Sequence, residues 1–372
     1  MPAILIVAGE PSGDLQASRV TAQLKTLRPD IELFGMGGDR MEAAGVSLVY
    51  HIRDSAVMGI GEVLSAIPAF LKKQRHLKRL IRKKRPDAVV LVDFAEFNMG
   101  LAACAHRLHI PVVYYIPPKA WAWRGYRAKK IAKRTSAVAS IFPFETDFYQ
   151  RAGANAQFVG HPLMDYANSE LSVVEAREKL GLATDAPVLG LVPGSRRREV
   201  DALYPAMLDT AEGVRRILPD CQLILPLAPS IPPETLPEAP AVNIVKDATY
   251  EAMRASDLIL VASGTATLEA ACLLTPMVVL YKLSRLSWWT AQRFVNLDSS
   301  ALPNIVAGHQ IVPEFLQDDV QVERITSIAL DLLRDSEKRE EQRAALCKVR
   351  QQLGDSRAAE RTAQLVLGYV ES

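Results

Sequence analysis

The stretch Asp87-Ala-Val-Val-Leu-Val-Asp93-Phe-Ala-Glu96-Phe-Asn98 has the pattern of a buried parallel strand that ends on a carboxylate. Its apolar residues, many of them β-branched, are typical of a strand that is covered on both faces. In an open α/β sheet, ligands bind beyond the carboxyl ends of the strands, where Asp93 is expected to lie. Asp93 is therefore a candidate base, although roughly half of the acids at such positions only cap the next helix.

Similar strand-like segments alternate with helical segments in two series. The first series predicts strands at residues 3–8, 32–36, 87–92, 111–116, 137–141 and 156–160. The second predicts strands at residues 187–194, 222–227, 242–245, 257–262 and 277–282. This alternation predicts α/β domains with parallel sheets and right-handed crossovers. We therefore expect two Rossmann-like domains that face each other across a cleft.

The expected domains span residues 1–165 and 173–335, with the linker near Met164–Ser172. Residues 336–372 form a predicted helical tail, rich in Glu, Gln, Arg, Ala and Leu. The tail either packs back on the first domain or exchanges with a second copy in a homodimer. Spacing alone leaves both arrangements open.

Composition indicates a soluble cytosolic protein. The chain has 372 residues, which is too long for one ordinary core, and no apolar run approaches the ~18–20 residues that span a bilayer. The start, MPAILIVAGE, is expected to be the first strand, because it lacks a basic region before its short apolar run. The four cysteines lie far apart and predict neither a disulfide nor a zinc site. The six histidines show no metal-ligand spacing, so no metal is expected.

Charge is distributed unevenly along the chain. Residues 1–165 contain 23 Lys and Arg against 14 Asp and Glu, and nine of the fourteen residues from Lys72 to Arg85 are basic. With the apolar residues before it, this run predicts a basic amphipathic helix over residues 60–85, suited to an anionic membrane surface. The alternative is a core helix with a solvated basic face. Nucleic acid is not favoured, because the run lacks interleaved aromatic residues.

Three turns join a predicted strand to a predicted helix and are rich in small residues. The turn from Ala8 to Asp14 contains Gly9 and Gly13, and Ser12 or Asp14 could cap its helix. A structural role and a substrate contact are equally compatible with this turn.

The other two turns have the composition of anion sites. The first contains Gly194-Ser195-Arg196 and the second Ser263-Gly264-Thr265. Free amides and the positive end of a helix dipole favour phosphate, and an arginine can bind it with two hydrogen bonds. Glu269, one helical turn after Thr265, could accept hydrogen bonds from ribose. Together these turns predict a nucleotide diphosphate site in the second half.

Several aromatic residues are less specific. Trp121-Ala-Trp123-Arg124 and Phe142-Pro-Phe144-Glu145 suit either an apolar pocket or packing beneath a loop. His161 lies at the expected domain junction, where it could touch substrate.

Taken in order, these segments resemble the lipid-A-disaccharide synthases, glycosyltransferases of the GT-B type. The resemblance rests on AGEPSGD, AVMGIGEVL, DFAEFN, WAWR, FPFE, FVGHPL, VPGSR, ASGTATLE, PMVVLYK and LPNIVAG, which run collinearly from residue 8 to about 308. No single string is specific, but the ordered set is.

The resemblance implies a reaction and a set of roles. UDP-2,3-diacylglucosamine would donate its sugar, with inversion, to 2,3-diacylglucosamine 1-phosphate (lipid X), on the cytoplasmic face of the inner membrane and without a cofactor. Asp93 matches the base, Arg196 the essential arginine and Asn304 the asparagine of the LPN motif. UDP would lie near residues 194–196 and 263–269. The residues assigned to acceptor or other contacts are Glu10, Ser12, Asn98 and His161.

The chain departs from the family pattern in two places. Ala95 replaces a common proline, and Pro117-Pro118-Lys119 stands in a segment that commonly reads Ser-Pro-Ser. Both departures lie on the expected acceptor side. The alternatives are a UDP-N-acetylglucosamine 2-epimerase, a lipid-linked peptidoglycan transferase, and a silent homologue that binds lipid or nucleotide.

Overall fold

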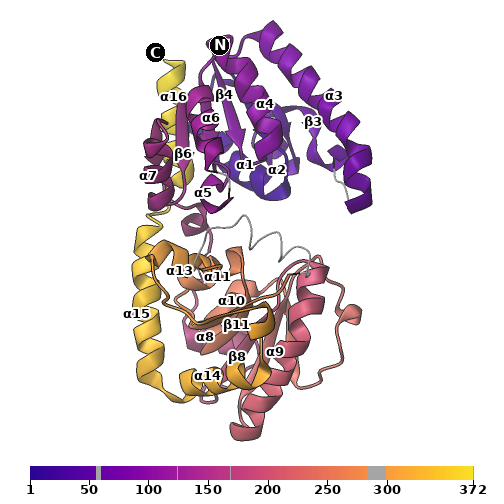
Figure 1. Ribbon diagram of the computed structural model, residues 1–372, viewed down its shortest axis with the longest axis vertical. Coiled ribbons are helices and arrows are strands. Elements are labelled where there is room, and N and C mark those ends of the chain that lie inside the picture. The colour runs from indigo at the N-terminus through magenta and orange to yellow at the C-terminus, as the bar shows by residue number, and fades with distance from the viewer. Residues whose placement is uncertain (56–59, 124, 168, 284–298, 372) are drawn as a thin grey trace. The chain divides into compact units, whose positions relative to one another are not determined.

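The computed structural model describes residues 1–55, 60–123, 125–167, 169–283 and 299–371, which form two compact units (Figure 1). Unit 1 consists of Met1–Pro162 and Leu353–Ser372, and unit 2 of Leu163–Gln352. The chain therefore passes between the units twice. Each unit contains one parallel sheet with helical crossovers, which confirms the predicted fold class.

Unit 1 contains a seven-stranded sheet in the order β3-β2-β1-β4-β5-β6-β7. Its strands are β1 (Ala3–Ala8), β2 (Glu32–Gly37), β3 (Ser47–His51), β4 (Ala88–Val92), β5 (Val112–Tyr115), β6 (Ala137–Ser140) and β7 (Ala156–Phe158). Its helices are α1 (Pro11–Leu27), α2 (Asp39–Ala43), α3 (Ile60–Lys84), α4 (Ala95–His106), α5 (Ala120–Trp123), α6 (Tyr126–Arg134), α7 (Pro143–Arg151) and α16 (Ala358–Val370). Every side chain of β4 is fully buried, as its uninterrupted apolar run predicts.

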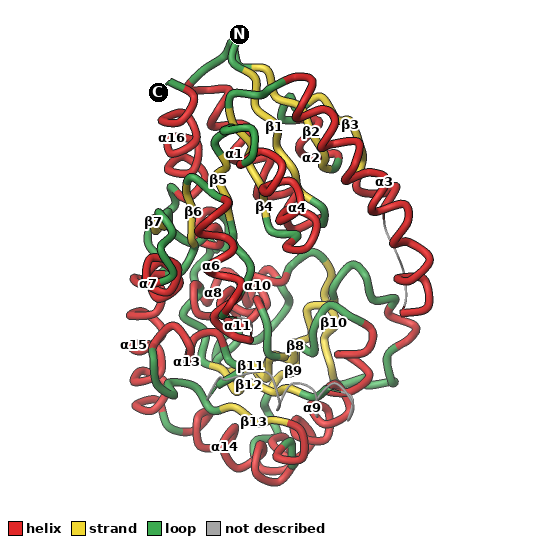
Figure 2. Tube along the Cα trace, turned by 45° about the horizontal axis from the view of Figure 1, so that its top comes forward, coloured by secondary structure: helices red, strands yellow, loops and turns green. Residues whose placement is uncertain are grey.

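Unit 2 contains a six-stranded sheet in the order β10-β9-β8-β11-β12-β13 (Figure 2). Its strands are β8 (Val188–Val192), β9 (Gln222–Leu227), β10 (Val242–Lys246), β11 (Leu258–Ala262), β12 (Met277–Tyr281) and β13 (Glu314–Leu316). Its helices are α8 (Val173–Lys179), α9 (Arg197–Ile217), α10 (Thr249–Ala255), α11 (Thr265–Cys272), α13 (Leu302–Ala307), α14 (Val322–Arg334) and α15 (Ser336–Gln352). Short 3-10 turns occur at Ile52–Ser55, Pro162–Asp165, Pro233–Thr235 and Gln317–Asp319.

Two strands were not predicted from the sequence. β3 is an edge strand whose residues are half-buried or exposed, so it lacks a continuous apolar pattern. β13 has only three residues, which is too short for an alternation to show. Both strands lie at the edges of their sheets, and the predicted central strands are all present.

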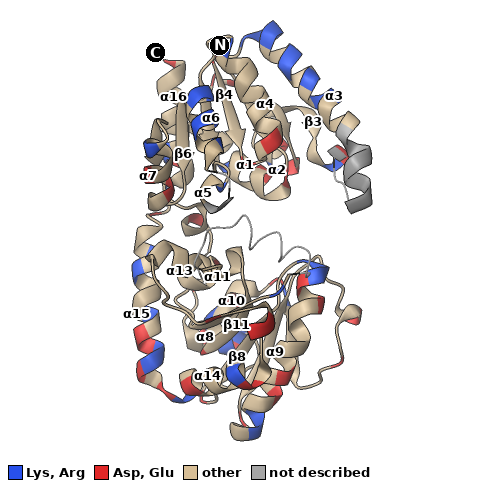
Figure 3. Cartoon of the chain, in the orientation of Figure 1, with Lys and Arg blue, Asp and Glu red and all other residues tan. Residues whose placement is uncertain are grey.

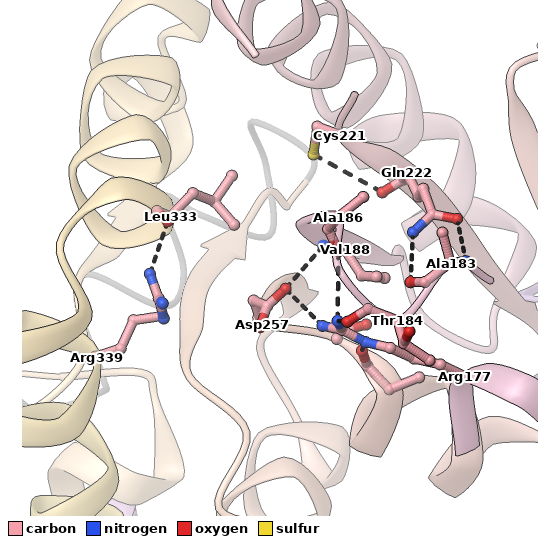
Figure 4. Close-up of polar contacts among 12 residues, drawn as sticks. Arg177, Ala183, Thr184, Ala186, Val188, Cys221, Gln222, Asp257, Leu333 and Arg339 are labelled. Carbon is pink, nitrogen blue, oxygen red and sulfur yellow. Dashed lines mark hydrogen bonds and ion pairs between the residues drawn. The ribbon is translucent and has the colours of Figure 1, made fainter. Parts of the chain in front are cut away.

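A buried arginine ties the start of unit 2 to its sheet (Figure 4). The Arg177 side chain is 7% exposed and forms an ion pair of 2.7 Å with Asp257, which also accepts a hydrogen bond from the Val188 amide. The guanidinium further donates to the carbonyl groups of Ala255, Thr184 and Ala186. Each guanidinium nitrogen of Arg177 thus has a partner, and this network holds α8 against the amino ends of β8 and β11.

Helix α3 has one face in the core and one face in solvent. Leu77 and Ile81 are fully buried in the core of unit 1, whereas the Lys and Arg residues from 82 to 85 are exposed (Figure 3). Residues 60–67 were predicted to carry apolar side chains that contact a membrane, and the structure describes their backbone but not their side chains. Over its described half, α3 therefore packs on the sheet through its apolar face and presents its basic face to solvent.

The last helix, α16, belongs to unit 1. It packs against α1 in the same chain. The Tyr369 hydroxyl donates to the Ser136 carbonyl over 2.9 Å, and the His161 amide donates to the Leu353 carbonyl over 2.8 Å. These bonds attach the returning chain to the β6 and β7 side of unit 1.

Candidate functional site

In unit 1, the strand order reverses between β1 and β4, which pair from Ile4↔Ala88 to Ala8↔Val92. The turns after these strands therefore meet at one point on the carboxyl edge of the sheet. Ligands of open α/β sheets bind at such a switch point. Asp93 lies in the turn after β4, as predicted.

The Asp93 turn has an unusual backbone. Asp93 and Phe94 both have positive φ angles, +47° and +50°, which are costly for residues other than glycine. The Asp93 carbonyl accepts hydrogen bonds from the Tyr114 hydroxyl at 2.8 Å and from the Asn98 amide at 2.7 Å. The Asp93 amide donates to the Tyr115 carbonyl at 3.2 Å. These contacts from α4 and β5 hold the strained turn in place.

Burial raises the pKa of the Asp93 carboxyl, and a backbone hydrogen bond from Phe94 and the charge of Lys119 partly oppose this shift. A raised pKa suits a carboxylate that must accept a proton near neutral pH. The geometry and the electrostatics of this turn are thus those of a candidate general base.

Asn98, assigned from the sequence to substrate contact, has no exposed surface. Its side-chain amide bonds to the carbonyls of Val92 and Asp93. In the structure, Asn98 therefore supports the Asp93 turn from below.

The turn after β1 lies directly beside the Asp93 turn. A Cβ atom on Gly9 would come within 2.1 Å of the Phe94 ring, so only glycine fits under this ring. Glu10 and Ser12 are both exposed at the same edge. The expectation that Ser12 or Asp14 caps α1 was wrong: the cap position is Glu10, and no side chain caps the helix there.

Asp14 instead caps a different helix. Its buried carboxylate accepts hydrogen bonds from the amides of Gly38 at 2.6 Å, Arg40 at 3.2 Å and Met41 at 3.1 Å. These amides belong to the start of α2. The acid that follows the first turn in sequence therefore stabilises the turn after β2.

Near the end of the first segment of unit 1, before Pro162, an aromatic cluster encloses Glu145 and His161. The Phe142 ring stacks on that of Phe144, with 5.3 Å between ring centroids, and lies 4.9 Å from the centroid of the His161 ring. The Trp121 ring meets Phe144 edge-on, with 5.0 Å between centroids. Arg124, the last residue of the WAWR string, lies outside the described residues. The paired aromatic strings therefore pack against each other.

Glu145 and His161 are both held in their neutral forms by burial. Burial raises the pKa of Glu145 to about 8, although its carboxylate accepts hydrogen bonds from the Trp121 indole at 3.0 Å and the Ile141 amide at 3.4 Å. Burial, aided by the charge of Lys119, lowers the pKa of His161 to about 3. His161 is only 6% exposed.

In unit 2, the strand order reverses between β8 and β11, and the two predicted anion turns meet there. Gly194 has a φ of +111°, and the Arg196 side chain is 82% exposed beside the start of the 21-residue helix α9. Glu199 pairs with Arg196 at 2.9 Å, and the Ser230 hydroxyl donates to the Ser195 carbonyl at 2.6 Å. Arg196 thus stands at a helix N-terminus that favours anions.

The second turn follows β11. Gly264 occupies the cap position of α11 with a φ of +151°, and neither Ser263 nor Thr265 caps the helix through its side chain. The Ser263 hydroxyl donates to the Ser300 carbonyl at 2.9 Å, while Thr265 is exposed. The exposed atoms of this turn face the same sheet edge as the turn after β8.

Glu269 has a partner that the sequence did not indicate. The Tyr250 hydroxyl donates to its carboxylate at 3.2 Å, and burial raises the pKa of Glu269. Tyr250 comes from α10, so only the fold brings the two together.

Asn304 is buried, and its side chain is hydrogen-bonded within the protein. It is 2% exposed, and its carbonyl oxygen accepts from the amides of Ile311 at 2.8 Å and Val312 at 3.0 Å. Its NH₂ group donates to the Val312 carbonyl at 3.0 Å and to Glu314 at 3.4 Å. The Asn304 amide is thus fully used within the protein.

Glu314, for which the sequence predicted no role, extends this network. Its carboxylate accepts hydrogen bonds from the Ser299 hydroxyl, from the Ser300 amide at 3.0 Å and from the Ala301 amide at 3.0 Å. Ser300 in turn bonds to Ser263. Asn304 and Glu314 therefore support the second anion turn from behind.

Within the described part of the chain, no group of three or more His, Cys, Asp or Glu residues is arranged to hold a metal. Over the same residues, no helix combines the length and the apolarity needed to cross a membrane.

Comparison with solved structures identifies proteins of the same fold. An *Acinetobacter baumannii* MurG structure has a TM-score of 0.62 and 16% identity, and covers 98% of this chain and 99% of its own. A UDP-GlcNAc 2-epimerase from *Neisseria meningitidis*, bound to UDP-GlcNAc, has a TM-score of 0.65 and 14% identity, covering 98% and 100%. At these identities the likeness shows the fold alone.

Sequence comparison is more specific. The family described as lipid-A-disaccharide synthetase matches residues 4–368. A lipid-A-disaccharide synthase from *Anaeromyxobacter* sp. (strain K) is 45% identical over 374 residues, covering 99% of this chain and 97% of the relative. One from *Geobacter metallireducens* is 41% identical over 369 residues, covering 98% and 96%. The chain therefore belongs to the lipid-A-disaccharide synthetase family, the glycosyltransferases that form the lipid A disaccharide.

Proposed function

We propose that the chain transfers the sugar of UDP-2,3-diacylglucosamine to 2,3-diacylglucosamine 1-phosphate (lipid X), releasing UDP and forming a β-1,6 disaccharide with inversion. The observation that carries this proposal is the Asp93 turn. It presents a carboxylate of raised pKa at the switch point of unit 1. A base that takes the proton of the attacking 6-hydroxyl group requires this combination.

Asp93 accepts this proton as the 6-oxygen attacks the anomeric carbon of the donor. The bond to the UDP oxygen breaks, and UDP leaves with the electron pair. Tyr114 and Asn98 act by positioning Asp93, because both bond to its carbonyl. Glu10 and Ser12 are exposed beside it and suit contacts with the acceptor.

UDP binds at the switch point of unit 2. The diphosphate lies at the amides of Gly194 and Ser195, with the Arg196 guanidinium as its cationic partner. Ser263, Gly264 and Thr265 supply further amides and hydroxyls. This arrangement stabilises the charge that develops on the leaving group without requiring a metal.

Two further residues complete the donor site. Glu269 accepts hydrogen bonds from the ribose hydroxyls, with Tyr250 holding its carboxylate. Asn304, fully bonded inside the protein, positions the segment behind Ser263 instead of touching UDP. His161, buried and neutral, supports the end of unit 1 instead of reacting.

The protein works at the cytoplasmic face of the inner membrane, where acylated substrates are found. The exposed basic face of α3 attracts anionic lipid at about 1 kcal/mol per nearby Lys or Arg. Because Leu77 and Ile81 pack in the core of unit 1, the described half of α3 contacts the membrane surface through its charged side chains. Sedimentation with liposomes should then depend on anionic lipid and weaken with salt.

The Asp93→Asn variant tests the role of the base. Turnover should fall by about 10²–10⁴-fold, because the amide cannot accept the proton. UDP affinity, measured by calorimetry, should not change, since UDP binds to unit 2. Loss of UDP binding in this variant would make Asp93 a structural residue. Consumption of UDP-N-acetylglucosamine without any acceptor would favour an epimerase instead.

A further inference from the structure

Lys119 lies in a turn that is fixed on both sides. Pro117 and Pro118 restrict the backbone before it. The Pro118 carbonyl accepts hydrogen bonds from the Tyr149 hydroxyl and from the Ala120 amide. Just beyond, the Trp121 indole is bonded to Glu145 at 3.0 Å. The backbone that carries Lys119 is therefore held in one place.

This turn lies next to Asp93. It follows β5, which pairs with β4 up to Val92↔Tyr115, and the Asp93 amide bonds to the Tyr115 carbonyl at 3.2 Å. The charge of Lys119 is close enough to lower the pKa of the Asp93 carboxyl. The pairing of β5 with β4 thus brings the turn that carries Lys119 to the same sheet edge as the candidate base.

The charge of Lys119 has no dedicated partner among the described residues. Its side chain is exposed and forms neither a hydrogen bond nor an ion pair with any of them. Besides the pKa of Asp93, the charge of Lys119 also lowers the pKa values of Glu145 and His161, which are both buried and neutral at pH 7. The backbone that carries Lys119 is held in place, and its exposed ammonium group is thus available for a ligand beside the base.

We propose that Lys119 binds the phosphate group of the acceptor and so orients the acceptor's 6-hydroxyl group towards Asp93. The proposal rests on the proposed function, which supplies an acceptor with a phosphate monoester. That phosphate and the reacting hydroxyl belong to one sugar ring, so a cation near the base can hold one while the base meets the other. Lys119 is then a specificity residue for the acceptor.

The test compares two acceptors on the full-length chain in mixed micelles. One is 2,3-diacylglucosamine 1-phosphate, and the other is the same lipid without the phosphate. The ratio of their kcat/KM values measures the preference for phosphate. Because a charge-assisted hydrogen bond is lost, Lys119→Gln should reduce this ratio by about tenfold or more through the KM of the phosphorylated acceptor. The KM of the UDP-sugar should stay unchanged.

Three variants control for charge and for folding. Lys119→Arg should keep most of the preference, and Lys119→Ser should behave like Lys119→Gln. Lys133→Gln removes the same charge from an exposed position on α6 and should keep the wild-type ratio. Removal of the cation should also shift the acidic limb of the kcat/KM profile to higher pH, because the pKa of Asp93 is no longer lowered.

The outcomes separate this inference from the proposed function. An unchanged phosphate preference in Lys119→Gln, or a wild type without such a preference, would overturn the role of Lys119 and leave the reaction intact. Absence of turnover by the wild type with either acceptor would overturn the proposed function, and the role of Lys119 with it.

Discussion

Replacing Asn304 with alanine should destabilise unit 2 strongly. The substitution removes four hydrogen bonds and leaves three backbone groups of Ile311 and Val312 without their partner. Each buried polar group that loses its partner costs about 1–3 kcal/mol, so the three together should cost about 3–9 kcal/mol. This is a large part of the stability of a typical domain. The affinity for UDP should fall as well, because the segment behind Ser263 loses its support.

Urea unfolding followed by circular dichroism measures the first effect, and calorimetry with UDP measures the second. Asn243→Ala is a matched control in the same unit, since among the described residues the Asn243 side-chain amide bonds only to the Leu180 carbonyl, at 3.0 Å. It should cost only about 1 kcal/mol. The reasoning would be refuted if Asn304→Ala unfolded at the wild-type urea concentration while losing UDP. Asn304 would then touch the nucleotide directly.

Three further substitutions test other parts of the structure. Glu145→Gln should flatten the pH dependence of the free energy of unfolding. In the wild type, the folded-state pKa of Glu145 is about 8, well above that of the unfolded chain. Its contribution to the free energy of unfolding is therefore complete below about pH 4.5 and falls by up to ~1.4 kcal/mol per pH unit as pH rises towards 8. Parallel wild-type and variant slopes in urea titrations from pH 5 to 8 would contradict this. Arg177→Met should cost about 3–5 kcal/mol in thermal or urea unfolding, because the partly buried Asp257 loses its cation and the carbonyl groups of Ala255, Thr184 and Ala186 lose their donor. A near-neutral result would show that the pair is dispensable. Gly9→Ala should reduce turnover at least tenfold without changing UDP affinity, since the new Cβ displaces Phe94 and the base beside it; full activity would show that the turn adapts freely.

The parts of the fold that follow from local pattern could be predicted. The run before Asp93 contains only apolar residues because β4 is covered on both faces, and the fold places its end at the switch point. The glycines at 194 and 264 likewise marked real turns, where both adopt positive φ angles. The presence of these strands and the position of Asp93 at the end of its strand are therefore encoded locally.

The roles that depend on distant partners could not be predicted in this way. Asp14 looked like a cap for its own helix, but its acceptor atoms meet amides about 25 residues later in the chain, at the start of α2. Asn304 was expected in the donor site only because it matches the LPN motif of the family, whereas the fold encloses its side-chain amide completely. Lys119 looked like a departure from a pattern until strand pairing placed it beside Asp93.

The central claim is that this chain joins two acylated glucosamines with release of UDP. The most direct test measures UDP release from UDP-2,3-diacylglucosamine with and without lipid X, and identifies the lipid product by mass spectrometry. The account predicts release only when lipid X is present, together with a tetraacyl disaccharide 1-phosphate. Tight binding of UDP without any release in the presence of lipid X would contradict it.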